Sequence, residues 1–469
     1  MEKFLQPISE KNNEDEGVII LKIETRSIEW VPREERHGKP SDLFSIWFGG
    51  NMHITTLVTG ALCVVSGLNL FWSVVAILLG NLIGAVFMAL HSAQGPILGI
   101  PQMIQSRAQF GIIGAIVPLI IVIFMYLGFF STSSLLAAQT INGAFSIPIT
   151  ASILIINLVV FIVTLYGHDL IQRMQKVLSW VFLAVYIFVT FVVFNTAVPA
   201  GSWNPGNFNL AVFLLAVSIT ATWQIAYAPY VADYSRYLPE DTSEKATFWY
   251  TYAGSVCASV WMMILGSFLV AANSKFLDAS GPNLAKLFGA FAIGIYIIII
   301  LGQISINSFN LYGAFMSTTT TVEPFLKMKV TPAVRGVFIA CIVAIASVIE
   351  ILGQGSFISL FKSFILFICY FLIPWTAINL IDFYLLRDGK YSVKDMFDLD
   401  GKYGRVNWIT MVAYVIAVLV EIPFVNTTFY VGPLCNALGG ADISWVLGLV
   451  IPCFLYYFPM KKKLRETGL

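Results

Sequence analysis

The chain has 469 residues, of which 58% are hydrophobic and only 11% are charged, and its formal net charge is +1. This composition lies far outside the range of soluble proteins and leaves no stretch for a separate soluble domain. A net charge close to zero also argues against a nucleic-acid partner, so the sequence predicts a single unit embedded in a lipid bilayer.

Twelve apolar runs follow one another along the chain, and each is long enough to cross a hydrocarbon core as a helix of ~20 residues. The runs begin near residues 42, 70, 108, 148, 176, 208, 247, 284, 330, 355, 404 and 441. We therefore expect an all-α polytopic membrane protein with twelve transmembrane helices. The predicted parts are an N-terminal tail (1–41), a ten-helix core (42–387), a loop with two further helices (388–459) and a basic tail (460–469).

The basic residues predict the topology. All of the 27 Lys and Arg residues except Lys275, Lys286 and Lys362 lie in the two tails or in alternate gaps between the apolar runs. By the positive-inside rule these segments are cytoplasmic. We expect a multi-pass protein of the cell (inner or plasma) membrane with both termini in the cytoplasm. The sequence does not indicate an oligomeric state.

Two of the runs contain residues that interrupt a helix. Gly49, Gly50 and Asn51 lie about one third of the way through the first run, and Pro229 follows Tyr227 inside the sixth. Proline removes a helical hydrogen bond, and broken backbone at lipid depth must line protein or a cavity. The alternatives are a close helix contact at the glycines and an ordinary proline kink. Matched breaks in two inverted five-helix repeats instead predict a transporter binding site.

The eighth run carries a third polar cluster after a stretch of purely apolar residues. Asn and Gln at this depth either join helices by hydrogen bonds or face a substrate. We expect Ser305 to be available to a cation and Asn310 to read the edge of a substrate. The cluster comprises Gln303, Ser305, Asn307, Ser308 and Asn310.

Four segments together resemble the nucleobase:cation symporter-1 family, the permeases for purines, cytosine, allantoin and hydantoins. They are Arg36–Phe44 with Trp47, Asn51 and Met52; Ser106–Gly111 with Gly114; Tyr166–Asp169 with Ile171–Arg173; and Ala232–Tyr237. The resemblance covers nearly the whole chain. The N-terminal segment and Asn310-Leu311-Tyr312 are most similar to the purine-cytosine permease branch.

The resemblance implies a five-plus-five inverted-repeat core with broken helices 1 and 6, followed by two C-terminal helices. It also implies a substrate held between aromatic side chains of helices 3 and 6 and hydrogen-bonded from helices 3 and 8. Carried over by motif, the helix 3 positions are Phe129 and Ser133, where the family usually has Trp and an amide. Either Trp223 or Tyr227 supplies the ring of helix 6. The remaining candidates are Asn310 of helix 8 and, at the two breaks, Gly49, Asn51 and Gln224.

Sodium sites in the family use carbonyls of the first break, here Gly49 and Met52, and two adjacent hydroxyls of helix 8. These hydroxyl positions fall on Ile304 and Ser305, so one hydroxyl is missing. This departure favours a proton as coupling ion, with Na⁺ at Ser305 as the alternative. The sequence implies no cofactor. The acidic residues of the runs all fall near run ends: Asp233, Asp382, Glu350 and Glu421. A proton carrier would therefore have to be His53 or a group brought inward by folding, and the alternative for His53 is a packed neutral histidine.

Charged residues between runs 4 and 5 (Gly167–Lys176) and after run 6 (Asp233–Arg236) are expected in solvated loops and helix ends. The alternative is that five of these and nearby residues form ion pairs that open and close a cytoplasmic gate. The five gate candidates are Arg107, Asp169, Arg173, Asp233 and Arg236.

The sequence thus predicts a secondary-active symporter that imports a purine, cytosine or related small heterocycle. The alternatives are a transporter of allantoin, hydantoin or a vitamin-like pyrimidine or pyridine, and, in another class, a channel or a non-transporting sensor. An enzyme is not expected, because the four histidines lie on separate segments and no nucleophile stands beside a base.

Overall fold

The computed structural model describes residues 28–326 and 330–467. Apart from an isolated bridge between Asn426 and Val431, these residues form helices, turns and loops, which confirms the all-α prediction. Runs 1 to 5 contain α1 (Pro40–Gly49), α2 (Ile54–Val65), α3 (Leu70–Leu98), α4 (Gln102–Phe110), α5 (Ile116–Phe145), α6 (Ile149–Tyr166) and α7 (His168–Phe194). Runs 6 to 10 contain α8 (Leu210–Ile225), α9 (Val231–Ser235), α10 (Glu244–Ala272), α11 (Ser280–Lys286), α12 (Ala292–Leu326), α13 (Pro332–Gly353) and α14 (Phe357–Leu380). The last two runs contain α15 (Trp408–Glu421), α16 (Pro433–Ala437), α17 (Ser444–Leu455) and α18 (Tyr457–Thr467).

Nine helical stretches in the described residues are long and apolar enough to cross a membrane, and the bent pair α1 and α2 makes a tenth. One of the nine contains both α13 and α14, which run on through a short turn, and the helix of run 11 is shorter than a full crossing. The protein is therefore a multi-pass membrane protein, and the number of twelve crossings stays a prediction.

Both predicted breaks are present. Helices α1 and α2 meet at residues 50–53 with a bend of 64°. In run 6, α8 ends at Ile225, a 3₁₀ turn (η3, Ala228–Tyr230) holds Pro229, and α9 follows. Each break thus divides its run where the glycine pair or the proline cannot continue an α-helix.

Helix packing reveals the two repeats. The broken run 1 packs on α10 of run 7, and the broken run 6 packs on α3 of run 2. Helix α7 of run 5 contacts α1 and α12, whereas α14 of run 10 contacts α8 and α5. Each contact thus recurs when run n is exchanged for run n + 5, which is the contact pattern of a five-plus-five inverted repeat. Helices α15 and α17 pack against α14 outside this core.

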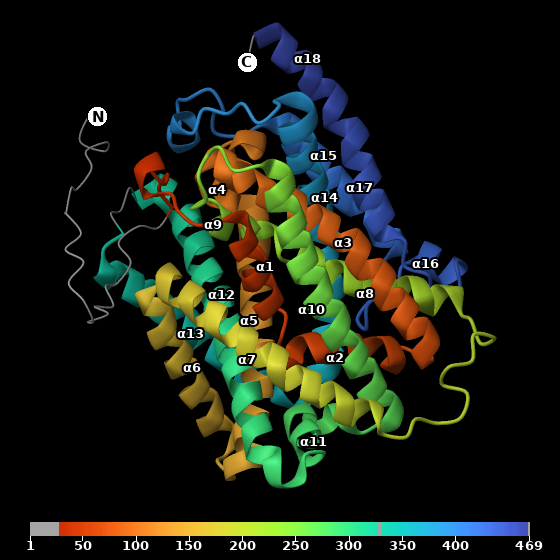
Figure 1. Cartoon of the computed structure of the whole chain (residues 1–469). Coiled ribbons are helices and arrows are strands. Elements are labelled where there is room, and N and C mark those ends of the chain that lie inside the picture. The colour runs from red at the N-terminus through yellow and green to blue at the C-terminus, as the bar shows by residue number, and fades with distance from the viewer. Residues whose placement is uncertain (1–27, 327–329, 468–469) are drawn as a thin grey trace.

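The outer surface of the bundle is apolar and its interior contains polar side chains, as expected for a membrane protein. Large apolar side chains of α7 point outward, with Trp180 exposed by 69% and Phe191 by 67%. The interior instead holds many buried polar side chains, such as Asn51, Gln224 and Asn307. In Figure 1 the segment leading into α1 and helix α18 lie at one end of the bundle, and α11 lies at the other.

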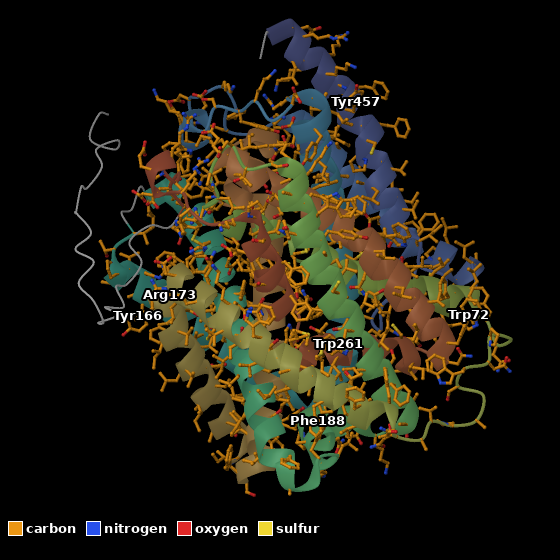
Figure 2. The ribbon with its side chains drawn as sticks, viewed as in Figure 1. Trp72, Tyr166, Arg173, Phe188, Trp261 and Tyr457 are labelled. Atoms are coloured by element: carbon orange, nitrogen blue, oxygen red, sulfur yellow. The ribbon has the colours of Figure 1, made fainter. Side chains whose placement is uncertain are left out.

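The charged segment Gly167–Lys176 differs from the expectation. Only Gly167, with φ of +87°, separates α6 from α7, and the remaining residues form the first turns of α7. Asp169 near the helix N-terminus and Arg173 one turn later both favour this helical start. Figure 2 labels Tyr166, the last residue of α6, and Arg173 in the first turns of α7.

The run Asp233–Arg236 is not solvated, because Asp233 and Arg236 are both buried. This differs from the expectation of a solvated loop. The reason is that α9 is packed against α3 and α4 rather than extending into the cytoplasm.

Asp382 connects the core to the C-terminal helices. Its carboxylate accepts hydrogen bonds from Tyr456 (2.7 Å), Tyr391 (2.7 Å), Gln109 (3.2 Å) and Arg387 (3.1 Å), and it is fully buried. We expect Asp382→Ala to destabilise the protein by about 3 to 5 kcal/mol, because it leaves the buried Arg387 guanidinium without its partner. The measurement is the thermal unfolding of the purified protein in detergent.

The matched control is Asp400→Ala, which removes an exposed carboxylate that pairs with Arg405 at 3.9 Å. An exposed pair contributes little, so this variant should unfold like the wild type. Equal unfolding temperatures for the two variants would contradict the assigned role of Asp382.

Candidate functional site

A narrow pocket lies between the two broken runs and brings residues of runs 1, 3, 6 and 8 together. Its lining consists of His53, Phe129, Ser133, Trp223, Ala226, Tyr227, Tyr230, Ile306 and Asn310. Among the residues expected to bind substrate, Phe129, Ser133, Trp223, Tyr227 and Asn310 are in this lining, whereas Gly49, Asn51 and Gln224 are not. Side chains nearly fill the pocket, so it must widen to admit a ring.

The apolar side of the pocket is built from rings that meet edge to face. Phe129 and Trp223 have centroids 5.6 Å apart at 89°, and Trp223 and Tyr227 are 6.1 Å apart at 87°. Phe364 of α14 supports Phe129 from behind at 5.0 Å. Trp223 and Tyr227 are four residues apart and therefore face the same side, so the two candidates of run 6 line the pocket together.

Asn51 holds these rings in place. Its Oδ1 accepts hydrogen bonds from Trp223 Nε1 (2.8 Å) and from the Tyr227 hydroxyl (3.0 Å). Its Nδ2 donates to the Trp47 carbonyl (2.8 Å) and to Ser255 Oγ (3.1 Å). All hydrogen-bonding positions of the amide are thereby used. Asn51 is a positioning residue that joins the break of run 1 to the aromatic residues of run 6.

Gln224 points away from the pocket. Its Nε2 donates to Asn81 Oδ1 (2.8 Å) and Ser259 Oγ (2.6 Å), and its Oε1 accepts from Ser255 (2.6 Å). Successive residues of a helix are rotated by about 100°, so Gln224 cannot share the face of Trp223. Its amide joins α8 to α3 and α10.

The polar side of the pocket comes from α5 and α12. Ser133 Oγ lies 3.0 Å from Thr55 Oγ1, and Gln303 Nε2 donates to the Ser133 carbonyl at 2.8 Å. Asn310 Nδ2 donates to Asn307 Oδ1 at 3.2 Å, and the rest of its amide borders the pocket. Buried hydrogen bonds therefore orient both residues that could read a substrate edge.

The break of run 1 also lies beside Ser305. The Met52 carbonyl faces Gly302, one turn before Ser305, and a Cβ on Gly49 would overlap Ser179 of α7. Ser305 Oγ donates to Gln175 Oε1, and Gln175, also on α7, is fully buried against Gly50. The sequence reasoning missed Gln175 because it lies in the segment that we expected to be a loop.

The five gate candidates do not form one network. Arg107 pairs with Glu323 at 3.0 Å and also donates to the carbonyls of Thr320 and Met396. Asp233 accepts from the Gln102 backbone N–H at 2.8 Å and interacts electrostatically with Arg236. Asp169, Arg173 and His168 form a third group at the start of α7.

Comparison with known proteins identifies the family. The family model for permeases of cytosine/purines, uracil, thiamine and allantoin matches residues 30–448. This chain belongs to that family. It is 58% identical to the "Putative purine-cytosine permease YxlA" of Bacillus subtilis (strain 168), over 96% of this chain and 98% of that protein. It is 25% identical to the purine-cytosine permease fcyB of Emericella nidulans, over 93% and 88%.

The fold is also that of a solved transporter. The structure of Mhp1, a nucleobase-cation-symport-1 family transporter, in a closed conformation with bromovinylhydantoin bound has a TM-score of 0.75 to this chain at 19% identity. The alignment covers 95% of this chain and 96% of Mhp1. This likeness confirms the fold with its broken helices, and the family is one of transporters, not of enzymes.

Asn51→Ala tests the positioning role. The variant leaves the donors of Trp223 and Tyr227 without an acceptor, and each such loss costs ~1–3 kcal/mol. We expect substrate to bind about 5- to 150-fold more weakly, because the rings lose their fixed orientation. Binding of radiolabelled substrate to purified protein measures the effect.

Asn195→Ala is the control, since it removes an exposed amide at the end of α7 that bonds only to the Phe191 carbonyl. Wild-type affinity in Asn51→Ala would show that the rings hold their places without Asn51.

Proposed function

We propose that the chain is a secondary-active symporter that imports a nucleobase, a purine or cytosine, by alternating access. The observation that supports this most directly is a pocket between two helix breaks. Its lining combines polar Ser133 and Asn310 with the aromatic rings of Phe129, Trp223, Tyr227 and Tyr230. A flat heteroaromatic ring gains ~1–3 kcal/mol by stacking on each such side chain, while one edge pattern satisfies the polar groups. Membership of the permease family and the names of its relatives agree with this substrate class.

Allantoin, hydantoin and vitamin-like pyrimidines or pyridines remain the second substrate class. Mhp1 shares the fold and holds bromovinylhydantoin, and the chain is 22% identical to a hydantoin permease of Microbacterium maritypicum. Relative to the family pattern, Phe129 provides less stacking area than Trp and Ser133 fewer hydrogen bonds than an amide.

We propose a proton as the coupling ion. The neighbour of Ser305 is the apolar Ile304, and the Ser305 hydroxyl donates its hydrogen to Gln175 Oε1. Gln175 thereby occupies the place between the break of run 1 and α12, where Gly49, Met52 and Ser305 would have to approach a sodium ion. The protein would lie in the cell membrane with both termini in the cytoplasm, as the basic residues predict.

The first test is uptake of radiolabelled cytosine, hypoxanthine, adenine, allantoin and hydantoin into cells without permeases of their own. We expect one nucleobase to accumulate against its gradient because a proton gradient drives it. A protonophore should abolish this accumulation, and replacing sodium with choline should leave it unchanged. Accumulation that requires sodium would instead assign Gly49, Met52 and Ser305 to a sodium site.

The same assay separates the other readings. Accumulation of only hydantoin or allantoin would select the second substrate class. Saturable binding without uptake would indicate a sensor, and uptake that does not saturate would indicate a channel.

Asp233 tests the cytoplasmic gate. Its carboxylate joins α9 to the start of α4 through the Gln102 N–H and interacts with Arg236. Both contacts would have to break when the gate opens. We expect Asp233→Asn to lower the maximal uptake rate several-fold at normal expression and substrate affinity, because the variant keeps the acceptor oxygen but loses the charge. Initial rates over a range of substrate concentrations measure this.

Asp241→Asn, at an exposed position of the same loop region, is the control. Unchanged uptake in Asp233→Asn would remove Asp233 from the gate.

A further inference from the structure

We propose that Glu350 of α13 is the proton-binding group of the symporter, and that a chain of hydrogen bonds connects it to the substrate-reading Asn310. Glu350 is only 2% exposed although it lies three residues before the end of α13. A buried acid within a transmembrane helix is costly and is usually functional. This inference rests on the proton-coupled transport proposed above.

The chain crosses four helices. Asn157 Nδ2 of α6 donates to Glu350 Oε2 at 2.8 Å, and Ser134 Oγ of α5 donates to Asn157 Oδ1 at 2.7 Å. Asn307 Nδ2 of α12 donates to Ser134 Oγ at 2.7 Å, and Asn310 Nδ2 donates to Asn307 Oδ1 at 3.2 Å. Each of these side chains is at most 2% exposed. The buried acid is thus linked to the pocket without an intervening apolar gap.

Every donor in this chain points toward the carboxyl group. Such an order fits an ionised Glu350, which can only accept hydrogen bonds. When a proton binds at Oε2, the resulting O–H becomes a donor, and Asn157 turns its Oδ1 toward Glu350. The Ser347 hydroxyl, which accepts from Asn157 Nδ2 at 2.9 Å, then donates to Asn157 instead. The change passes on when Ser134 turns its hydrogen toward Asn307 and Asn307 turns its Oδ1 toward Ser134. This turn gives up the hydrogen bond that Asn307 Nδ2 donates to the Phe130 carbonyl at 3.1 Å. At the far end Asn310 then accepts from Asn307, and its Nδ2 becomes free to donate to the substrate.

The two states of the chain therefore offer different edges to a substrate. With Glu350 ionised, Asn310 directs one N–H of Nδ2 to Asn307 and keeps Oδ1 for the pocket. With Glu350 protonated, Asn310 presents N–H groups, which suit a carbonyl or ring nitrogen of a nucleobase. A substrate that prefers the second state raises the affinity for the proton, and the proton raises the affinity for the substrate by the same factor.

Few other titratable groups lie near Glu350 that could bind the proton in its place. Among the described residues, the polar groups that face its carboxyl are Asn157, Ser131 and Ser134, and Oε1 has no hydrogen-bond partner. Helices α5, α6 and α12, which pack against α13, carry only these titratable residues in addition: Tyr126, Tyr166, Tyr296, Tyr312 and Glu323. Glu323 is paired with Arg107, and on α13 itself Arg335 lies near the opposite end. A proton on Oε1 would be a buried donor without a partner, whereas a proton on Oε2 can donate to Asn157, so the proton belongs on Oε2.

The alternative is a purely structural bond between α6 and α13. The distinguishing experiment measures binding of radiolabelled hypoxanthine to the purified full-length protein between pH 5.5 and 8.5, together with accumulation and exchange in proteoliposomes. For the wild type we expect affinity to fall by about 5- to 150-fold as the pH rises, the usual range of coupling between two sites.

Glu350→Gln keeps the shape of the protonated acid and cannot lose its proton. We expect it to bind hypoxanthine as the wild type does at low pH, with less than about a twofold change over the pH range, a small fraction of the coupling expected for the wild type. It should exchange hypoxanthine but no longer accumulate it in response to a proton gradient. Ser134→Ala, which interrupts the chain with little change of volume, should also bind substrate and should lose most of the pH dependence.

Glu421→Gln is the matched control. Glu421 of α15 is also fully buried, and neither of its carboxylate oxygens has a hydrogen-bond partner among the described residues, but it is outside the chain to Asn310. This variant should keep the pH dependence of the wild type. Retained pH dependence and accumulation in Glu350→Gln, or their loss in Glu421→Gln as well, would overturn the assignment.

The wild-type measurements distinguish a failure of the proposed function from a failure of the Glu350 assignment. If the wild type neither binds nor accumulates hypoxanthine, the substrate class is wrong, and the Glu350 comparison is made with the ring that the uptake screen identifies. If wild-type uptake is concentrative but independent of pH, the proton is not the coupling ion, and the role of Glu350 falls with it. If Glu350→Gln does not fold, Ser134→Ala decides the question.

Discussion

The structure depends on one constraint, namely that a backbone amide or polar side chain inside the hydrocarbon layer must find its hydrogen-bond partner within the protein. The two broken runs are the places where this constraint is hardest to meet. At the first break the amide of Asn51 satisfies Trp47, Ser255, Trp223 and Tyr227 at once. The hydrogen bonds of Asn51 therefore stabilise the first break and also hold the rings of Trp223 and Tyr227 in place.

The same constraint explains why polar side chains cluster between helices rather than singly. One cluster joins α8, α3 and α10 by hydrogen bonds among four polar side chains, namely Gln224, Asn81, Ser255 and Ser259. Such a network rigidifies the interface that it crosses, because each group left unpaired in a medium of low dielectric would be costly. We infer that the pocket is carried by two comparatively rigid contacts, between runs 1 and 7 and between runs 2 and 6, which the inverted repeat relates to each other.

The network from Glu350 to Asn310 differs from these in one respect. Its terminal group is an acid, so the direction of all its hydrogen bonds follows the charge of a single carboxyl group. A network of amides and hydroxyls can take two donor orders, and a proton can offset the loss of the bond from Asn307 to the Phe130 carbonyl and select the second order. This provides a physical link between proton and substrate that needs no large movement at the midplane. In alternating access, Glu350 and Asn310 would then both face the outside in one state and both face the cytoplasm in the other.

Much of the fold was predictable from the sequence. The apolar runs, the breaks at Gly49-Gly50 and Pro229, and the motifs of the permease family are all local signals. Both breaks reappear in the structure and the family model confirms the family, whereas the described residues hold nine membrane-length stretches, or ten with the bent pair, so the twelve crossings stay a prediction. Local signals succeed here because helix formation within a bilayer is dictated by the composition of about 20 residues at a time. The aromatic pocket residues Phe129, Trp223 and Tyr227 also followed from their position near a break or within a motif.

The tertiary structure decided which polar side chains face the pocket. Sequence placed Asn51 and Gln224 in the site, but helix rotation turns Gln224 toward α3 and α10 and uses Asn51 as a support. Sequence assigned Gln175 to a loop and Glu350 to the end of a run, whereas packing buries the first against Ser305 and the second against Asn157. These pairs are separated by more than a hundred residues, and a contact over that distance depends on how whole helices are oriented. The sequence by itself thus determined the number of apolar runs, their breaks and the family. Only the packing of the helices decided which of the buried polar groups support the site, which ones read the substrate, and which acid is connected to them.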